Sequence, residues 1–204
     1  EKKKTQKEIN RENLQSGISI IYQHPLFKGC TSRIHIVNKS DIGTNTMCIV
    51  HSDGTIKANE DYTLSPKQWS YVLAHNILRL AFGHFDAEKM PGYYITLSDG
   101  SKEKKIECDI ALWNMACDIY ITKFLADIKF GQPINNDNVN IISGTSNDEA
   151  KIYQSLCDQN ISATHNHYGT AAMGTLDMKG LDKPLVYNKA KNQYNTFTRN
   201  FSIA

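Results

Sequence analysis

The positions of apolar residues along the chain predict two long buried helices. Residues 65–85 (SPKQWSYVLAHNILRLAFGHF) and 108–130 (CDIALWNMACDIYITKFLADIKF) are apolar on nearly every helical face, as in helices enclosed by protein on all sides. The first carries a strong helix-start signal: Ser65 can cap the helix, Pro66 fits the first helical position, and Gln68 completes a capping box. We therefore expect a central helix over 65–85, supported by a second helix over 108–130.

Extended segments precede and separate these helices. Residues 34–37 are rich in β-branched side chains, and residues 46–51 and 55–57 flank a Ser-Asp-Gly sequence, a short-range signal for a β-hairpin. A further extended piece, residues 93–97, lies between the two helices. This order of elements predicts one α+β domain, in which a small sheet with a hairpin packs beside the central helix.

The two ends of the chain differ from this apolar middle. Residues 1–13 are polar and predict a tail or a frayed helix. Residues 148–158 predict a short amphipathic helix, and residues 159–204 are rich in Gly, Thr, Asn and Lys without a helical or strand period. We expect a polar tail over 1–13, a domain over 14–158, and a loop-rich segment over 159–204 that packs on the domain or leads to a further region.

Composition narrows the classes of function. The chain has 204 residues and a net charge of +2, which gives no electrostatic case for binding nucleic acid or acidic lipid. No apolar run approaches the roughly 20 residues of a membrane span, and the sequence shows no basic-then-apolar segment of the kind expected of a leader. The five cysteines are scattered, without a C-x-x-C motif, which favours free thiols in a reducing compartment. We expect a cytoplasmic protein that binds neither nucleic acid nor membrane.

Each of the two buried helices carries a stripe of polar side chains. His75 and Arg79 are four residues apart on the first helix, and Asn114, Asp118 and Thr122 repeat every four residues on the second. A single polar residue on such a helix is usually a structural group or reaches to water. A buried polar group without a partner costs about 1–3 kcal/mol, so two facing stripes have the lowest energy. The sequence predicts that Arg79 pairs with Asp118, with His75 close by and with Asn114 and Thr122 in support.

The first stripe lies in a segment that resembles a known catalytic motif. Residues 73–84, LAHNILRLAFGH, resemble the zincin helix, whose H-E-x-x-H sequence would have Glu at position 76 and His at position 79. In that motif, histidines at i and i+4 hold zinc and the glutamate polarises the attacking water. Here the sequence keeps only His75 of the three.

Other segments extend the resemblance in the same order and spacing: His84, W-N-x-A-C-D at 113–118, E-A-x-I-Y-x-x-L at 149–156, His24-Pro25, and the hairpin that ends near Asn59. Together they resemble the metallopeptidase-like domain family that is often found ahead of a von Willebrand factor A-like domain in bacterial proteins. The resemblance spans roughly residues 14–158. It implies a zincin-like α+β fold and, in intact members, zinc-dependent peptide hydrolysis.

The departures from the family motif change what the resemblance implies for activity. Asn76 stands at the catalytic-base position and does not take up a proton at neutral pH. Arg79 stands at the second-ligand position and is a permanent cation. His75 remains, with His84 or Asp118 as a candidate third ligand, which falls short of the three protein ligands usual in catalytic zinc sites. We expect Arg79 to take the space of the metal and to neutralise Asp118.

The leading hypothesis is a catalytically inactive metallopeptidase-like domain, without a metal cofactor, that acts as a binding or assembly module. Its partner would be a protein or an extended peptide at a strand edge, and a von Willebrand factor A-like domain is a further candidate. The alternative is a zinc-dependent hydrolase using His75, His84 and Asp118. Because residue 84 is about half a turn from residue 75 on a continuous helix, that set requires a break near Gly83. A plain structural domain is a third hypothesis.

Overall fold

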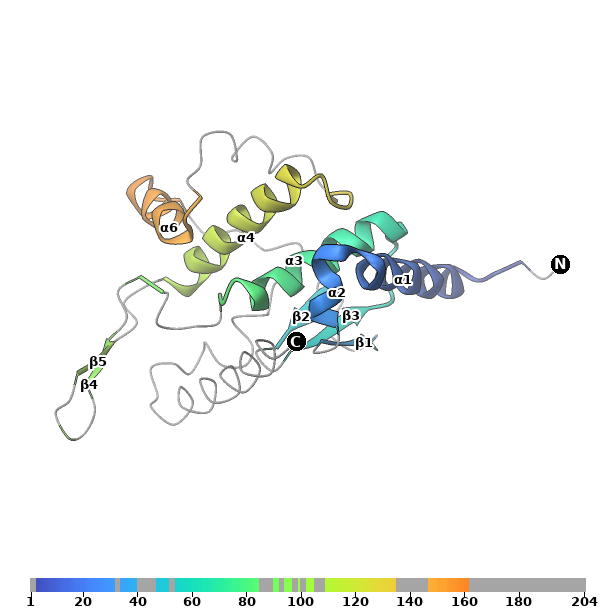
Figure 1. Ribbon diagram of the computed structural model, residues 1–204, viewed down its shortest axis with the longest axis horizontal. Helices are drawn as coiled ribbons and strands as arrows, with labels where there is room; N and C mark the ends of the chain where they lie inside the picture. The colour runs from blue at the N-terminus through green and yellow to red at the C-terminus, as the bar shows by residue number, and fades with distance from the viewer. Residues whose placement is uncertain are drawn as a thin grey trace.

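The structure is a computed structural model with an α+β architecture, which confirms the predicted fold class. It describes residues 3–31, 34–39, 47–51, 54–84, 90–91, 94–96, 99, 102–104, 109–134 and 147–161. The described elements, labelled in Figure 1, are α1 (Gln6–Gln23), α2 (Pro25–Thr31), β1 (His35–Lys39), β2 (Cys48–Val50), β3 (Thr55–Asn59), α3 (Pro66–Ala81), β4 (Tyr94–Thr96), β5 (Lys102–Lys104), α4 (Ile110–Asp127) and α6 (Glu149–Asp158).

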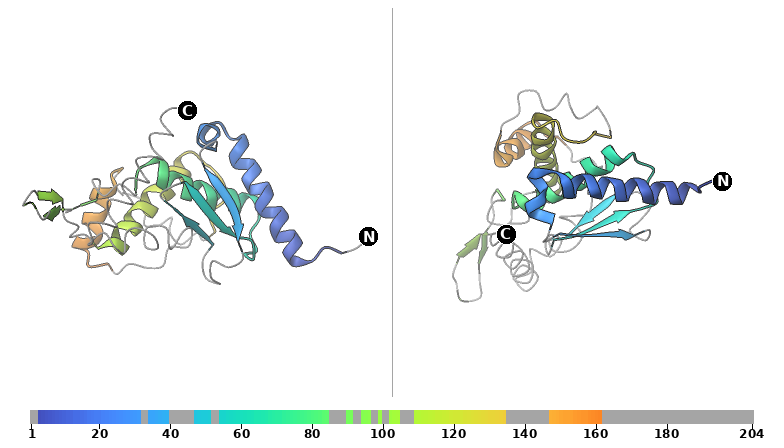
Figure 2. Two further views of the ribbon diagram at one scale, coloured as in Figure 1. Left: turned by 90° about the horizontal axis from the view of Figure 1, so that it is seen from below. Right: turned by 45° about the vertical axis from the view of Figure 1, so that its right-hand side comes forward.

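The main sheet has the strand order β1-β3-β2, with β1 parallel and β2 antiparallel to β3. Its inner face is apolar because alternate residues point to the same side: Cys48 pairs with Ala58 and Val50 with Ile56, and all four are fully buried. Helices α1 and α3 lie on this face (Figure 2). The β2–β3 pairing confirms the predicted hairpin, although residues 52–53 of its turn lie outside the described residues.

The central helix α3 forms as its sequence predicts. The Ser65 hydroxyl accepts a hydrogen bond from the backbone N–H of Gln68, and the Gln68 side chain accepts one from the backbone N–H of Ser65. Every residue from 69 to 80 is buried, so α3 is enclosed on all sides. The helix ends at Ala81, and the chain then turns at Gly83, whose φ of 71° favours glycine.

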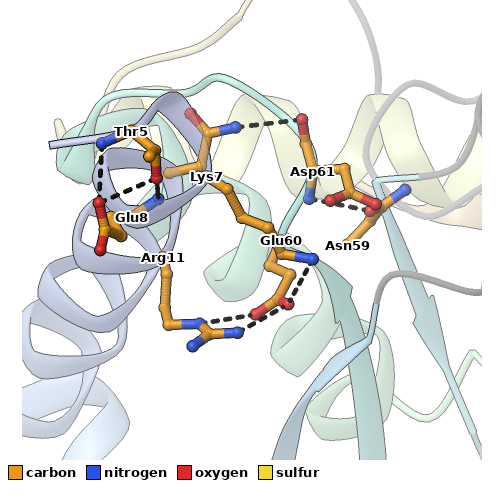
Figure 3. Close-up of polar contacts among 8 residues, drawn as sticks. Thr5, Lys7, Glu8, Arg11, Asn59, Glu60 and Asp61 are labelled. Carbon is orange, nitrogen blue, oxygen red and sulfur yellow. Dashed lines mark hydrogen bonds and ion pairs between the residues drawn. The ribbon is translucent and has the colours of Figure 1, made fainter.

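Helix α1 begins within the segment predicted as a polar tail or a frayed helix. Thr5 and Glu8 form a reciprocal capping box at its start (Figure 3). The Arg11 guanidinium also donates two hydrogen bonds of 3.1 Å to Glu60, and Asn10 donates to the backbone carbonyl of Asp61. The polar pattern could not indicate these contacts, because they are made to the β3–α3 connection some fifty residues away.

These contacts make α1 a support for the connection that leads into α3. Further along α1, Asn13 donates to the backbone carbonyl of Leu64. Gly17 then allows a close approach, since a Cβ built there would lie 2.5 Å from the Cβ of Trp69. The start of α3 is therefore held by backbone-directed hydrogen bonds and by tight packing against α1.

Helix α4 packs on α3, and α6 packs on α4. Asp109 caps α4 by accepting from the backbone N–H groups of Ala111 and Leu112. Ile152, Tyr153 and Leu156 form the buried face of α6. Apart from residues 159–161, the predicted C-terminal segment lies outside the described residues. Within the described residues, no helix combines the length and apolar composition that crossing a bilayer requires.

Candidate functional site

A buried ion pair joins α3 to α4 at the point where the two polar stripes meet. Arg79 donates from Nη2 to Oδ1 of Asp118 and from Nη1 to Oδ1 of Asn114, the latter at 3.1 Å. The Arg79 side chain is completely buried, and that of Asp118 is 15% exposed. The predicted pairing of Arg79 with Asp118 is confirmed, and Asn114 supports it.

His75 lies beside this pair. Its Nε2 atom is 3.7 Å from Oδ1 of Asp118, and its ring is completely buried. Burial, and next the charge of Arg79, lower the pKa of His75 well below its ordinary value of 6.5. The imidazole is therefore neutral at physiological pH, and the Arg79 guanidinium is the cation that faces Asp118.

The charge of Asp118 depends on this environment. Burial raises the pKa of Asp118 from 3.8 to about 7, and the Arg79 guanidinium opposes that rise through its charge and its hydrogen bond. Without a neighbouring cation, the carboxyl group would be held still more strongly in its protonated form. Arg79 is thus the group that allows a carboxylate at this position near neutral pH.

Asn76 is fully buried and hydrogen-bonded within its own helix. Its Nδ2 atom donates to the backbone carbonyl of Val72 at 2.8 Å. A carboxamide offers no proton-accepting base at neutral pH. Thr122, one turn beyond Asp118 on α4, is also buried. Of the predicted cluster, His75, Arg79, Asn114 and Asp118 lie in contact with one another.

His84 follows α3 and makes a separate contact. Its Nε2 atom is 2.9 Å from Oε1 of Glu149 at the start of α6, and its backbone carbonyl accepts from Nε1 of Trp113 at 3.5 Å. The rings of Trp113 and Tyr120 meet the imidazole edge-on. The sequence analysis placed Glu149 in the family resemblance but did not predict its contact with His84. An acidic residue in the first turn of a predicted helix was a signal, but nothing local indicates that this turn reaches residue 84.

The donor set for a metal ion is incomplete in the part of the chain that the structure describes. No three His, Cys, Asp or Glu side chains gather closely enough there to hold one. The break after α3 that the alternative ligand set requires is present, since Gly83 has a positive φ. His84 nevertheless pairs with Glu149, and it does not form such a group with His75 and Asp118. The residue four positions after His75 is Arg79, which cannot coordinate a metal ion.

Comparison with known proteins identifies the family. A protein-family model described as "Putative metallopeptidase domain" matches residues 10–189, which extends beyond the resemblance over 14–158. A search of curated proteins and a search of solved structures gave no match. The matched region includes α3, α4, α6 and the polar cluster between the first two. Since the match covers most of the chain, this protein belongs to the family that this model describes.

Proposed function

We propose that this chain is a catalytically inactive member of its family that serves as a protein- or peptide-binding or assembly module. The observation that carries the proposal is the Arg79 guanidinium, which is fully buried and paired with Asp118. It occupies the position four residues after His75, where H-E-x-x-H has its second zinc ligand. Asn76, at the position of the catalytic glutamate, donates to the Val72 carbonyl instead of offering a base.

The residues present do not fit the zinc ion that the family name implies. A catalytic zinc site uses three protein ligands of the His, Asp, Glu or Cys type, with a fourth position left for water or substrate. Here the Arg79 guanidinium contacts the Asp118 carboxylate. A divalent cation bound to Asp118 would meet that fixed positive charge in a buried setting, where repulsion is weakly screened.

Metal content and peptide hydrolysis test the loss of catalysis directly. We expect purified protein, dialysed without chelator, to hold far less than one zinc per chain by mass spectrometry. Hydrolysis of a mixed peptide substrate should stay at the background level and be unchanged by a chelator. One tightly held zinc per chain, or hydrolysis that the chelator abolishes, would contradict the proposal and favour the alternative set of His75, His84 and Asp118.

An edge of the main sheet is the proposed binding surface. In the described part of the chain, β1 is the longer of the two edge strands. The backbone N–H of His35 donates to the Gly54 carbonyl, so alternation along the strand directs the backbone groups of Ile36 and Asn38 away from β3. An extended peptide can add to such an edge through backbone hydrogen bonds.

Substituting the edge residue Asn38 tests the binding surface. Asn38→Pro removes one outward N–H without disturbing the β1–β3 hydrogen bonds, whereas Asn38→Ala keeps that N–H. With peptides selected from a random library on the native chain, we expect the proline variant to lose binding and the alanine variant to retain it. Equal binding by both variants would exclude this edge.

The partner and the compartment complete the proposal. A von Willebrand factor A-like domain, in the same polypeptide or as a separate protein, is the partner that the family resemblance favours. Direct titration of such a domain with the native chain and with the proline variant would test it. A reducing compartment such as the cytoplasm is the proposed location, since Cys30, Cys48, Cys117 and Cys157 are free thiols.

A further inference from the structure

We propose that a second copy of this chain binds at the β1 edge, where the two β1 strands pair antiparallel about a twofold axis at Val37. The proposal rests on the proposed function, in which this edge is the binding surface, and it names a partner for that surface. Pairing in this way joins two three-stranded sheets into one continuous sheet. A peptide that adds to β1 then competes with the second copy, so self-association regulates access to the edge.

The first argument is that the middle of β1 lacks the features that protect an exposed strand edge. Strand β1 is an outer strand of the main sheet (Figure 2). Its sequence, His-Ile-Val-Asn-Lys, has two β-branched residues near its centre, no proline and no acidic residue, and its lysine is at the last position. Soluble proteins usually interrupt an exposed edge with proline, a bulge or a charged side chain. The middle of β1 is therefore suited to pairing with another strand.

The second argument is that the backbone of β1 is complementary to itself. The backbone N–H of His35 donates to the Gly54 carbonyl, so the backbone groups of Ile36 and Asn38 are directed away from β3. With Val37 on the axis, all five residues of β1 are paired, and Ile36 of one copy lies opposite Asn38 of the other. Each of these pairs exchanges two N–H···O bonds, which gives about four bonds between the two copies.

The third argument comes from the residues that this register places opposite each other. Val37 is 37% exposed, and of the exposed large apolar side chains that the structure describes, it is the one that lies in a strand. In the dimer it faces its own copy in a non-hydrogen-bonded pair, where Cα atoms are about 4.5 Å apart and side chains are close. Antiparallel pairing also places Lys39 opposite position 35 of the other copy, whereas parallel pairing in register places the two lysines side by side.

The expected dimer is weak and reversible. Two strands of five residues alone are too short to bury the roughly 1,200 Å² of a stable protein–protein interface. We therefore expect mostly monomer at micromolar chain concentration and substantial dimer at roughly 0.1–1 mM. A peptide that binds β1 more tightly than this can displace the second copy.

Disulfide trapping tests the register. Cysteines at position 37 of two paired copies have Cα atoms about 4.5 Å apart, within the roughly 4.4–6.8 Å that a disulfide requires. His35→Cys is the matched control, because His35 is also exposed but its two copies are offset by four residues, roughly 14 Å along the strand. In glutathione buffer, Val37→Cys should form covalent dimer at least about tenfold faster than His35→Cys. The native chain, with five cysteines of its own, gives the background rate.

Sedimentation equilibrium tests the pairing without a crosslink. Asn38→Pro removes one N–H from each copy, and with it about half of the bonds between the strands, whereas Asn38→Ala keeps them. Val37→Lys places two like charges opposite each other. The proline and lysine variants should raise the Kd of the dimer at least about tenfold, and the alanine variant should leave it nearly unchanged. Circular dichroism checks that each variant is folded, and the trapping experiment decides if one is not.

Each result supports or overturns the proposal. A native chain that stays monomeric at about 1 mM overturns it, and so does equal crosslinking of Val37→Cys and His35→Cys. Dimers of Asn38→Pro and Val37→Lys as tight as the native dimer also overturn it, because the copies then meet at another surface. A monomeric chain that still binds library peptides at β1 leaves the proposed function intact. Bound zinc or chelator-sensitive hydrolysis contradicts the proposed function whether or not the chain dimerises, so the two failures are distinguishable.

Discussion

Substitution of Arg79 by methionine should destabilise the domain far more than an ordinary surface substitution. The change keeps an unbranched apolar side chain in the buried position but leaves Asp118 without its cation. Arg79 is completely buried and Asp118 is 15% exposed, so the pair is a buried one with a small opening to solvent. Removing one member of a buried ion pair costs about 3–5 kcal/mol.

The structure places the expected cost at the lower end of that range. Burial already raises the pKa of Asp118 to about 7, so without Arg79 the carboxyl group can become neutral by taking up a proton near physiological pH. We therefore expect Arg79→Met to lower the free energy of unfolding by about 3 kcal/mol. Asp118→Leu alone should cost at least as much, because the Arg79 guanidinium cannot lose its charge.

The double variant gives the sharpest measurement. Replacing both members of a buried ion pair by apolar residues is often neutral or stabilising, by roughly 1–4 kcal/mol relative to the pair. Arg79→Met with Asp118→Leu should therefore be much more stable than the sum of the single losses. Urea unfolding followed by circular dichroism measures all four chains, with Lys151→Met on exposed α6 surface as the control for a neutral change.

Two results would refute this reasoning. A loss below about 0.5 kcal/mol for Arg79→Met would place the substitution in the range of surface changes, like the Lys151→Met control. Single losses that add within about 0.5 kcal/mol in the double variant would show that the two side chains are not coupled. In either case, the ion pair would not hold α3 against α4.

Two further predictions concern helix α1. Gly17→Ala should lower the free energy of unfolding by about 1–3 kcal/mol, because the new Cβ would lie 2.5 Å from the Trp69 Cβ. Gly29→Ala is the control, since the space around its new methyl group is open. An equal effect of the two substitutions on chemical unfolding would contradict the packing argument. Arg11→Gln should lower stability at neutral pH but not in acid. The hydrogen bond from Arg11 lowers the pKa of Glu60 below 4.5. The stabilisation from this contact is therefore present above pH 4.5 and is lost as the pH falls through the lowered pKa. A difference in stability between the variant and the native chain that persists at about pH 2–3 would contradict this prediction.

The fold could be predicted from the sequence where the residues that determine an element lie close together in the chain. The Ser65, Pro66 and Gln68 pattern contains both hydrogen bonds of the capping box, and the apolar run after it indicates burial without reference to any other segment. The pairing of Arg79 with Asp118 was also predictable, because two polar stripes on buried helices have few other partners available. In both cases, the alternative arrangements of these residues cost enough free energy that only one arrangement is stable.

Other features depend on contacts between distant segments, and the sequence pattern does not contain them. The start of α1 is stabilised by Glu60 and the Asp61 carbonyl, and these partners are known only once β3 is placed beside the helix. The parallel pairing of β1 with β3 could likewise not be predicted, since the sequence of a strand does not determine which strand lies next to it. The contact of His84 with Glu149 joins the segment after α3 to α6, and the two residues are 65 positions apart in the sequence.

The contacts of Arg79 also explain why an asparagine, and not a glutamate, is stable at position 76. A glutamate there would be enclosed in a helix whose neighbouring guanidinium is already engaged by Asp118 and Asn114. Without a metal ion to share, a second buried carboxylate would compete with Asp118 for one cation, at a cost of several kcal/mol (about 3–5 for an uncompensated charge). Asn76 avoids that cost, since it is neutral and donates to the Val72 carbonyl. An asparagine at position 76 is thus energetically compatible with an arginine at position 79, whereas a glutamate beside that arginine is not.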